Sequence, residues 1–228
     1  TGTQTLTNKT LTAPKINEDV AVTSTATELN LLDGKAATNL ALLGKTEGTN
    51  FTGSLLVGHA TTGTLSTATN NTGVGTTALD ALTSGDYNTG IGFDAVTTLN
   101  TARFNTGVGY RSLRLVSSGE GNTAIGTYSL DVNSIGTNNT AIGRNALISN
   151  TLGDFNTALG YESGRASNGN DANYNLTLGS YSGDNITTGA GNVIIGSVDA
   201  GSATGDRQLV VAGNDGSTTT TWISGDSN

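Results

Sequence analysis

The apolar and polar positions of this chain follow a short phrase that recurs every 17 residues. The phrase is Asn, Thr, a small residue, an aliphatic residue and Gly, and it begins at Asn71, Asn88, Asn105, Asn122, Asn139 and Asn156. Weaker copies begin elsewhere in the chain, at Ser54, Asn175, Asn192 and Leu209. A fixed period of this length predicts a repeat protein, in which each unit packs on its neighbours rather than around one compact core.

Each repeat contains two apolar pieces, which become clear when its Asn is numbered as position zero. Position three is aliphatic and position four is Gly, while position seven is small and position eight is mostly Leu or Val. Two strand-sized pieces separated by turn residues predict two short strands and two turns in each coil. The fold class is therefore expected to be all-β, a parallel β-solenoid of about ten coils over residues 51–228.

The alternation of side chains along a strand places positions one and three on one face and position two on the other. Position one is Thr in the regular repeats but apolar in the weaker ones, for example Leu176 and Val193. This change predicts that positions one and three face inward. Position two is Gly or Ala in the regular repeats, which predicts an outer surface that neighbouring chains approach closely in a homotrimer.

Stacked coils bring equal positions together as columns. The Asn column is expected to form a turn with stacked side-chain amides, because Asn tolerates left-handed backbone and bonds locally. Opposite charges 17 residues apart, at Asp86 and Arg103 and at Asp94 and Arg111, predict ion pairs between successive coils. The aromatic residues just before the Asn are expected to pack on the turns, namely Tyr87, Phe104 and Phe155.

Residues 1–50 lack the repeat and form a separate predicted region. Their first part alternates Thr with Leu or polar residues and contains Pro14, which favours an extended linker. The spacing of Thr25 and Glu28 is that of a capping box, which predicts a short helix over residues 25–32. Apolar residues then recur with the spacing of a coiled-coil seam, at Leu29, Leu32, Ala36, Leu40 and Leu43. Two interpretations stay open, a trimerisation segment or a helix docked on the first coil.

Composition disfavours several classes of function. The net charge is −8, with 10 basic against 18 acidic residues, so no nucleic-acid surface is expected. No apolar run is long enough to span a membrane, and membrane insertion is not expected. Cys is absent and His59 is the single histidine, so thiolate sites, histidine-cluster metal sites and Cys-His catalysis are not expected. Oxygen-rich calcium sites stay open as an alternative at Asp80, Asp86, Asp94 or Asp154, but these residues are expected at turns or on the surface. We therefore expect neither a cofactor nor a metal ion.

Glycoside hydrolysis needs only two carboxyl groups at a defined separation. Glu120, Asp154, Glu162 and Asp184 are candidates, yet nothing in the sequence singles out two of them. We therefore expect that the chain is not an enzyme and keep a polysaccharide depolymerase as the alternative.

The candidates for binding lie at positions five and six, after the Gly of each repeat. They are unusually bulky for a chain with 5% aromatic residues, and they are Phe93, Tyr110, Arg111, Tyr128, Arg144, Tyr161 and Tyr181. Aromatic faces can stack on sugar rings, which predicts a receptor-binding column along one edge. The alternative is that these side chains fill grooves between neighbouring chains. The insertion at residues 168–174, which breaks the period, is a further candidate for recognition.

Two segments of the first region, residues 3–14 and 25–34, resemble linking segments of bacteriophage tail fibres. The repeat Asn-Thr-Ala-Ile-Gly, followed by Ala or Ser, is similar to that of the head domains of trimeric autotransporter adhesins. The final residues, 221–228, resemble the junction that leads into a self-cleaving trimerisation chaperone of such fibres. These resemblances imply a left-handed β-roll, a homotrimer, and a location in the virion as the distal part of a tail fibre.

The function implied by the resemblance is structural and receptor-binding. The expected partners are other tail proteins and a bacterial surface glycan or outer-membrane protein, bound through many weak contacts that act together. The head of a bacterial trimeric adhesin is the alternative. Ice binding by the Thr column is a third hypothesis, which the expected inward direction of that column disfavours.

Overall fold

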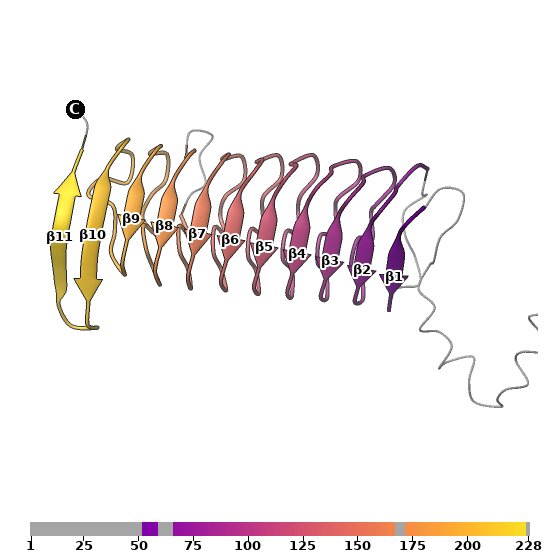
Figure 1. Ribbon diagram of the computed structural model, residues 1–228, viewed down its shortest axis with the longest axis horizontal. Coiled ribbons are helices and arrows are strands. Elements are labelled where there is room, and N and C mark those ends of the chain that lie inside the picture. The colour runs from indigo at the N-terminus through magenta and orange to yellow at the C-terminus, as the bar shows by residue number, and fades with distance from the viewer. Residues whose placement is uncertain (1–51, 59–65, 167–171, 227–228) are drawn as a thin grey trace, which may run out of the picture. The chain divides into compact units, whose positions relative to one another are not determined.

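The computed structural model describes residues 52–58, 66–166 and 172–226, and every regular element among them is a β-strand. Eleven strands form one sheet in sequence order, so each strand lies beside the next one of the chain (Figure 1). They are Leu55–Val57 (β1), Thr72–Val74 (β2), Thr89–Ile91 (β3), Thr106–Val108 (β4), Thr123–Ile125 (β5), Thr140–Ile142 (β6), Thr157–Leu159 (β7), Leu176–Leu178 (β8), Val193–Ile195 (β9), Leu209–Asn214 (β10) and Thr219–Gly225 (β11). This confirms the all-β solenoid predicted from the period.

The strands β1 to β10 pair in parallel, and the partners are equal positions of successive repeats, such as Thr106 with Thr123. Nine turns therefore connect ten parallel strands. The tenth repeat differs from its expected alignment by one residue, because Leu209 pairs with Val193 and Gln208 therefore holds position zero. After β10 the chain reverses, and β11 pairs with it in antiparallel orientation.

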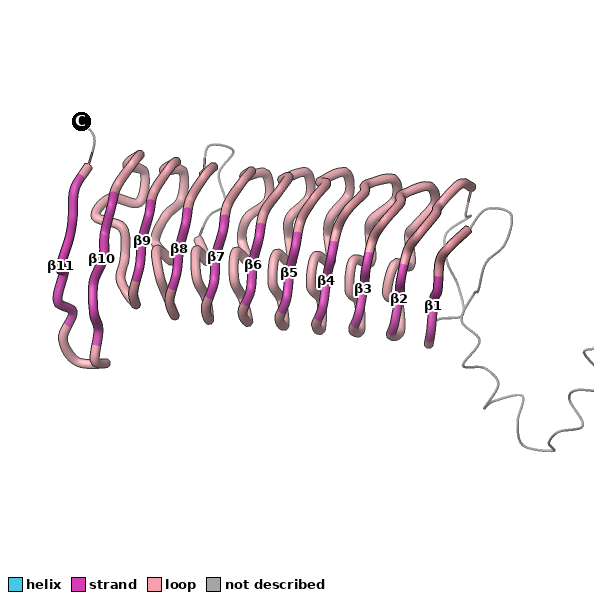
Figure 2. The backbone as a smooth tube through the Cα atoms, in the orientation of Figure 1, coloured by secondary structure: helices cyan, strands magenta, loops and turns pink. Residues whose placement is uncertain are grey.

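Each described coil contains a single strand, and the rest of the coil is turns and loops (Figure 2). The second strand expected around positions seven and eight is a run of turn residues instead. Positions six and eight have left-handed backbone there, with φ of 56° at Arg111 and 50° at Leu113. Left-handed residues interrupt an extended chain. Their N–H groups still bond between coils, as from Leu113 to the carbonyl oxygen of Ser129 at 3.0 Å.

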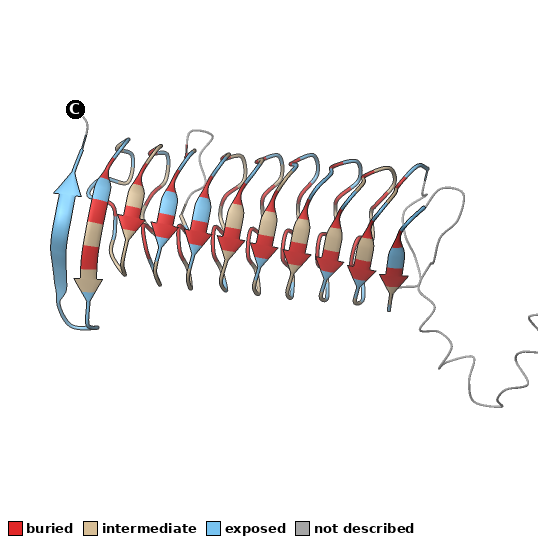
Figure 3. Ribbon diagram, viewed as in Figure 1, coloured by how far each residue is buried: buried red, intermediate tan, exposed pale blue. Residues whose placement is uncertain are grey.

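The strand side chains point in directions opposite to those expected from the sequence. Position two is buried, as at Ala124 and Ala141, whereas the residues on either side of it are half-buried or exposed (Figure 3). At position three, Ile91 is 39% exposed and Ile125 is 41% exposed. The prediction that positions one and three face inward was therefore wrong. The assignment of the Gly and Ala positions to an outer surface between chains was wrong for the same reason.

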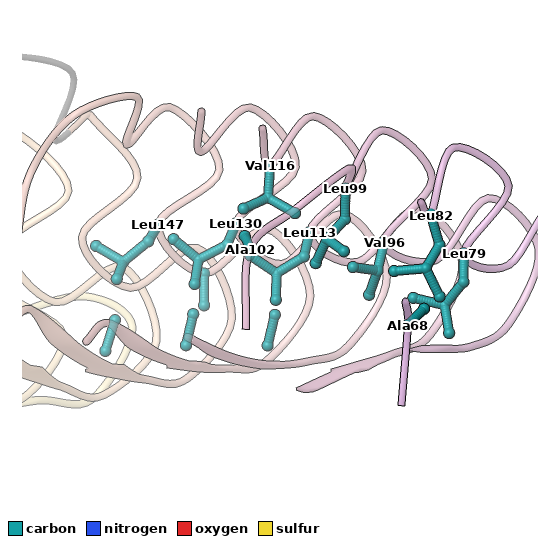
Figure 4. Close-up of a cluster of buried hydrophobic side chains, with 14 of the residues drawn as sticks. Ala68, Leu79, Leu82, Val96, Leu99, Ala102, Leu113, Val116, Leu130 and Leu147 are labelled. Carbon is teal, nitrogen blue, oxygen red and sulfur yellow. The ribbon is translucent and has the colours of Figure 1, made fainter. Parts of the chain in front are cut away.

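The small residues at position two leave room for a large side chain from the opposite wall. Position eight supplies it, and its residues line up along the solenoid with at most 2% exposure: Leu79, Val96, Leu113, Leu130 and Leu147 (Figure 4). Full burial of such a side chain contributes about 1.5–3 kcal/mol. The Gly and Ala pattern therefore reflects a thin interior, which in these coils is filled from the wall opposite the strand.

The Asn side chains at position zero form a hydrogen-bonded ladder. The Oδ1 of Asn105 accepts hydrogen bonds from the backbone N–H and Nδ2 of Asn122 at 3.0 and 3.1 Å, and its Nδ2 donates to the carbonyl oxygen of Gly119 at 2.9 Å. The ladder ends at Ser54 on one side and at Gln208 on the other. This confirms the predicted stacking of amides and places it in the interior, where paired amides fix the register of the coils.

The Gly at position four has a backbone conformation that other residues rarely adopt. Its φ is between 112° and 139° in the eight coils from Gly75 to Gly196. A Cβ added to Gly109 would lie 2.7 Å from the carbonyl carbon of Gly126 in the next coil. Both the left-handed corner and the close stacking of coils therefore require glycine at this position.

The ion pairs predicted between successive coils are confirmed. The Nε of Arg103 lies 3.4 Å from Oδ2 of Asp86, and the Nε of Arg111 lies 3.2 Å from Oδ2 of Asp94. The pairs are partly exposed, so their contribution to stability is about 0–1 kcal/mol each.

Some predictions concern residues outside the described part of the chain. They are the linker and helix of residues 1–50, the loop that contains His59, and most of the insertion at residues 168–174. Among the described residues, no helix is long and apolar enough to cross a membrane.

Candidate functional site

The bulky side chains at positions five and six lie at the corner that follows the Gly of each coil. We call this set the corner column, which consists of Phe93, Asp94, Tyr110, Arg111, Tyr128, Arg144, Asn145, Tyr161, Glu162 and Tyr181. The N–H of position six donates to the carbonyl oxygen of position five in the preceding coil, as from Arg111 to Phe93 at 2.9 Å. These bonds keep the side chains in register, and all seven predicted receptor-binding residues belong to the column.

The first half of the corner column is a continuous cluster of rings and one guanidinium. Phe93 and Tyr110 stack with centroids 5.5 Å apart and planes 11° apart. Tyr110 meets Tyr128 edge-to-face at 5.3 Å. The guanidinium of Arg111 lies 5.2 Å from the centre of the Tyr110 ring and is also bound to Asp94, so it is held in place by a cation–π contact and an ion pair.

The second half of the column is a similar cluster in the later coils. The guanidinium of Arg144 lies 5.5 Å from the centre of the Tyr161 ring, and Tyr161 meets Tyr181 edge-to-face at 5.1 Å. Glu162 accepts a hydrogen bond from Nδ2 of Asn145 at 3.2 Å. Among the described ring contacts, none joins this cluster to the first one.

The protonation states of the second cluster follow from its hydrogen bonds. Hydrogen bonds to Glu162 and Tyr181 raise the pKa of Tyr161 to about 12. The same contact with Tyr161 lowers the pKa of Glu162 below its ordinary value. At neutral pH the column therefore presents a neutral phenol beside an ionised carboxylate.

The geometry of the column leaves its rings less suited to stacking on sugars than the sequence predicted. Phe93 and Tyr110 cover one another's faces, yet they remain 46% and 39% exposed. Much of the accessible surface of these rings is therefore edges, together with phenol hydroxyls and guanidinium groups. Such groups hydrogen-bond to a ligand rich in hydroxyl or anionic oxygen atoms. They offer fewer open ring faces for the stacking on sugars that the sequence suggested.

A second aromatic column lies just before the Asn ladder. Tyr87 stacks on Phe104 with centroids 5.3 Å apart, and Phe155 stacks on Tyr174 at 4.9 Å. The sequence predicted that such rings pack on the turns. In the structure they also pack on one another between coils, and all four remain at least 46% exposed.

The sequence did not reveal a carboxyl pair near the C-terminal end of the solenoid. The side chains of Asp184 and Asp199 are hydrogen-bonded to each other in a hollow of about 440 Å³, which Tyr181, Asn214 and Thr219 also line. Burial and this contact raise the pKa of Asp184 to about 6. Directly bonded carboxyls are closer than the roughly 5–9.5 Å that separates the two groups of glycosidases. Asp199 was missed because it lies where the period changes, between Asn192 and Gln208.

Two other observations bear on the function. The part of the chain that the structure describes contains no group of three or more His, Cys, Asp or Glu residues that could hold a metal ion. The chain matches no protein-family model, no curated protein and no solved structure. The site must therefore be interpreted from its own geometry.

Proposed function

We propose that this chain is a structural and receptor-binding segment of a phage tail fibre, assembled from three copies. The observation that supports assembly most strongly is the outer face of the sheet. None of the eleven described strands contains Asp, Glu, Lys or Arg. Position three adds a continuous aliphatic column to this face, from Val57 in β1 to Val211 in β10.

The size of this outer face supports the same proposal. The ten parallel strands are spaced about 4.8 Å apart and pair over three residues each, so they cover roughly 50 Å by 10 Å in plan. This face of roughly 500 Å² combines the aliphatic column with the Thr column from β2 to β7, and large uncharged patches that expose apolar side chains mark interaction sites. A neighbouring copy presents the same spacing along its own sheet. Closed packing of three chains would cover all three faces at once.

The first test is the mass in solution, measured by multi-angle light scattering. We expect three times the 22.9 kDa of one chain. Ile125→Glu places a charge on the outer face and should give single chains, because a desolvated charge opposes association. Ile135→Glu is the matched control, since Ile135 is 49% exposed but lies outside the strands. A single-chain mass for the unaltered protein would contradict the assembly.

Receptor binding is assigned to the corner column and needs a separate test. Purified capsule and lipopolysaccharide from candidate hosts are titrated by calorimetry against the unaltered chain and against Tyr161→Phe, Arg144→Ala and Phe104→Ala. We expect the first two variants to weaken binding, because they remove a hydroxyl and a guanidinium of the corner column. Phe104→Ala changes an exposed ring outside the column and should leave binding intact. Equal affinities in all four proteins would exclude the column as the receptor site.

The outward direction of the Thr column favours ice binding as a second candidate function. Thr72, Thr89, Thr106, Thr123, Thr140 and Thr157 form one column beside the aliphatic one. Hydroxyl and methyl groups repeated at about 4.8 Å form a regular surface that could order water. Assembly and ice binding use the same face, so they exclude one another. A single-chain mass with a lowered freezing point relative to melting, lost in Thr106→Lys, would favour this second function.

A further inference from the structure

The hairpin β10–β11 ends the outer face with the only tryptophan of the chain. Trp222 is 68% exposed and Ile223 is 54% exposed, and all residues of β11 lie at the surface (Figure 3). A tryptophan and an isoleucine side by side in water lose the stabilisation that burial would give them. A partner that covered both side chains would restore this stabilisation. The position of the two side chains on the sheet indicates which partner that is.

The register of the hairpin places both side chains on the outer face. Ile223 pairs with Val211, so it continues the aliphatic column of position three into β11. The register shifts between Val211 and Ala212, which leaves Trp222 as the extra residue of a bulge. A Cβ added to Gly213 would lie 2.7 Å from the indole of Trp222, so the ring rests directly on this glycine.

The outer face also becomes more apolar towards this end. Position one is Thr from β2 to β7, whereas β8, β9 and β10 have Leu176, Val193 and Leu209 there. The apolar surface beside Trp222 is therefore about twice as wide, in columns, as the surface of the regular coils. Tryptophan is enriched among the residues that dominate binding energy, and such residues lie in well-packed apolar surroundings.

We infer that Trp222 and Ile223 anchor the lateral contact between copies of this chain at its C-terminal end. The occupant of this surface is a second copy for two reasons. The face has no charge with which to attract a charged partner. Its two columns repeat at the strand spacing over ten strands, and the same face of another copy matches that spacing along its whole length. This inference rests on the proposed assembly and assigns its strongest contact.

The indole provides its own readout, because no other tryptophan contributes to the fluorescence. Acrylamide quenching of Trp222 and light scattering are recorded together over a dilution series of the full chain. We expect a threefold mass with a shielded indole at high concentration. On dilution, both signals should change together to single chains with an indole accessible to acrylamide.

Three variants test whether Trp222 contributes to the association of the chains. Trp222→Ala should weaken association at least about 30-fold, the range of a dominant interface residue. Trp222→Phe keeps a ring over Gly213 and should retain most of the association. Gly213→Ala displaces the indole without removing it, and should weaken association while Trp222 becomes accessible to quencher. Thermal unfolding of each variant checks that the solenoid is intact, which is expected because the hairpin lies at one edge of the described sheet.

The possible outcomes distinguish this inference from the assembly on which it rests. A threefold mass with an indole as accessible as in single chains, unchanged by Trp222→Ala, overturns the anchor and leaves the assembly standing. Single chains at all concentrations overturn both. A mass that grows without limit overturns the anchor in favour of end-to-end pairing through β11, whose uncharged edge lacks the usual protection against such pairing.

Discussion

The coils of β2 to β6 and the coils of β8 and β9 build the same solenoid, but their large interior side chains come from opposite walls. In the coils of β2 to β6 position two is Gly or Ala and position eight is Leu or Val. In the coils of β8 and β9 position two is Thr177 or Ile194, and position eight is Gly183 or Ala200. The coil of β7 lies between the two kinds, with Ala158 at position two and Gly164 at position eight. A Cβ added to Gly183 would lie 2.8 Å from Cγ2 of Thr177, so the larger side chain fills the space from the strand.

This difference shows that the interior has a fixed width, which either wall can fill. Protein interiors are close-packed, so a methyl gained on one side must be lost on the other. The two regions share the parts that do not depend on volume, which are the Asn ladder and the left-handed Gly of position four. The backbone of a coil therefore tolerates different side chains inside, but not at its corner or in its ladder.

The largest expected effect concerns the difference between two neighbouring glycines of one coil. Gly109→Ala should destabilise the solenoid by about 4 kcal/mol or more, because its Cβ meets the backbone of the next coil at φ of 133°. Gly107→Ala should cost about 1–3 kcal/mol, because the nearest neighbour of its Cβ is a side-chain atom, Cγ2 of Val96 at 2.6 Å, and other coils have Ala at this position. Urea unfolding measures the loss of stability in both variants. Equal losses would contradict the view that glycine is required at the corner, position four, more strictly than at the interior position two.

The fixed width of the interior can be tested by removing a large side chain at position two of a later coil and by adding one at position two of a regular coil. Ile194→Ala removes a buried side chain from a later coil and should cost about 3 kcal/mol. Ala141→Ile adds volume to the same column in a regular coil, where Leu130 and Leu147 already fill the space, and should cost about 1–3 kcal/mol. Thermal unfolding measures both. Tolerance of Ala141→Ile without loss would show that the regular interior is wider than described.

The ladder is expected to matter equally in both regions. Asn105→Ala leaves the backbone N–H of Asn122 and the carbonyl oxygen of Gly119 without their side-chain partner, which should cost about 2 kcal/mol. Asn100→Ala is the control, because the Asn100 side chain is exposed and accepts a surface hydrogen bond from Thr83, and it should change the free energy of unfolding by less than about 0.5 kcal/mol. Denaturant titration of the two variants decides whether the loss of stability in Asn105→Ala results from the burial of its amide.

The smallest expected effect is a pH dependence confined to the C-terminal end. The pKa of Asp184 is raised from 3.8 to about 6, mainly by burial and by its bond to Asp199, with Arg165 opposing and Glu162 adding to the shift. A raised pKa means that the folded state holds the proton more tightly than the unfolded state. The associated stability is complete below pH 3.8 and is lost as the pH rises through about 6.

Hydrogen exchange of β10 and β11 measures this effect at about pH 5 and about pH 7.5, after correction for the intrinsic exchange rate. We expect greater protection at the lower pH. Asp199→Asn removes the repulsion and should reduce the dependence, while the regular coils should show none. The effect is small because Asp184 is only partly buried. Equal protection at both pH values would exclude the carboxyl pair as a local determinant of stability.

The sequence by itself determined the repeat, the order of the strands and the residues that stack upon one another. A constant spacing forces equal positions into columns, so the Asn ladder, the ion pair of Asp86 with Arg103 and the corner column all followed from counting. The assembly, the receptor and the absence of catalysis remain predictions. The helix expected over residues 25–32 lies outside the described residues.

Only the tertiary structure decided which side of the strand is inside. Alternation gives two faces but does not say which one is buried, and Leu176 and Val193 suggested the wrong one because apolar residues are expected in a core. The deciding fact was the large residue at position eight, which enters from a turn that the sequence predicted as a second strand. Left-handed backbone at Leu113 turns that side chain inward, and pattern counting does not reveal it. The solenoid therefore has small residues where its strand faces the core, and its apolar columns face outward.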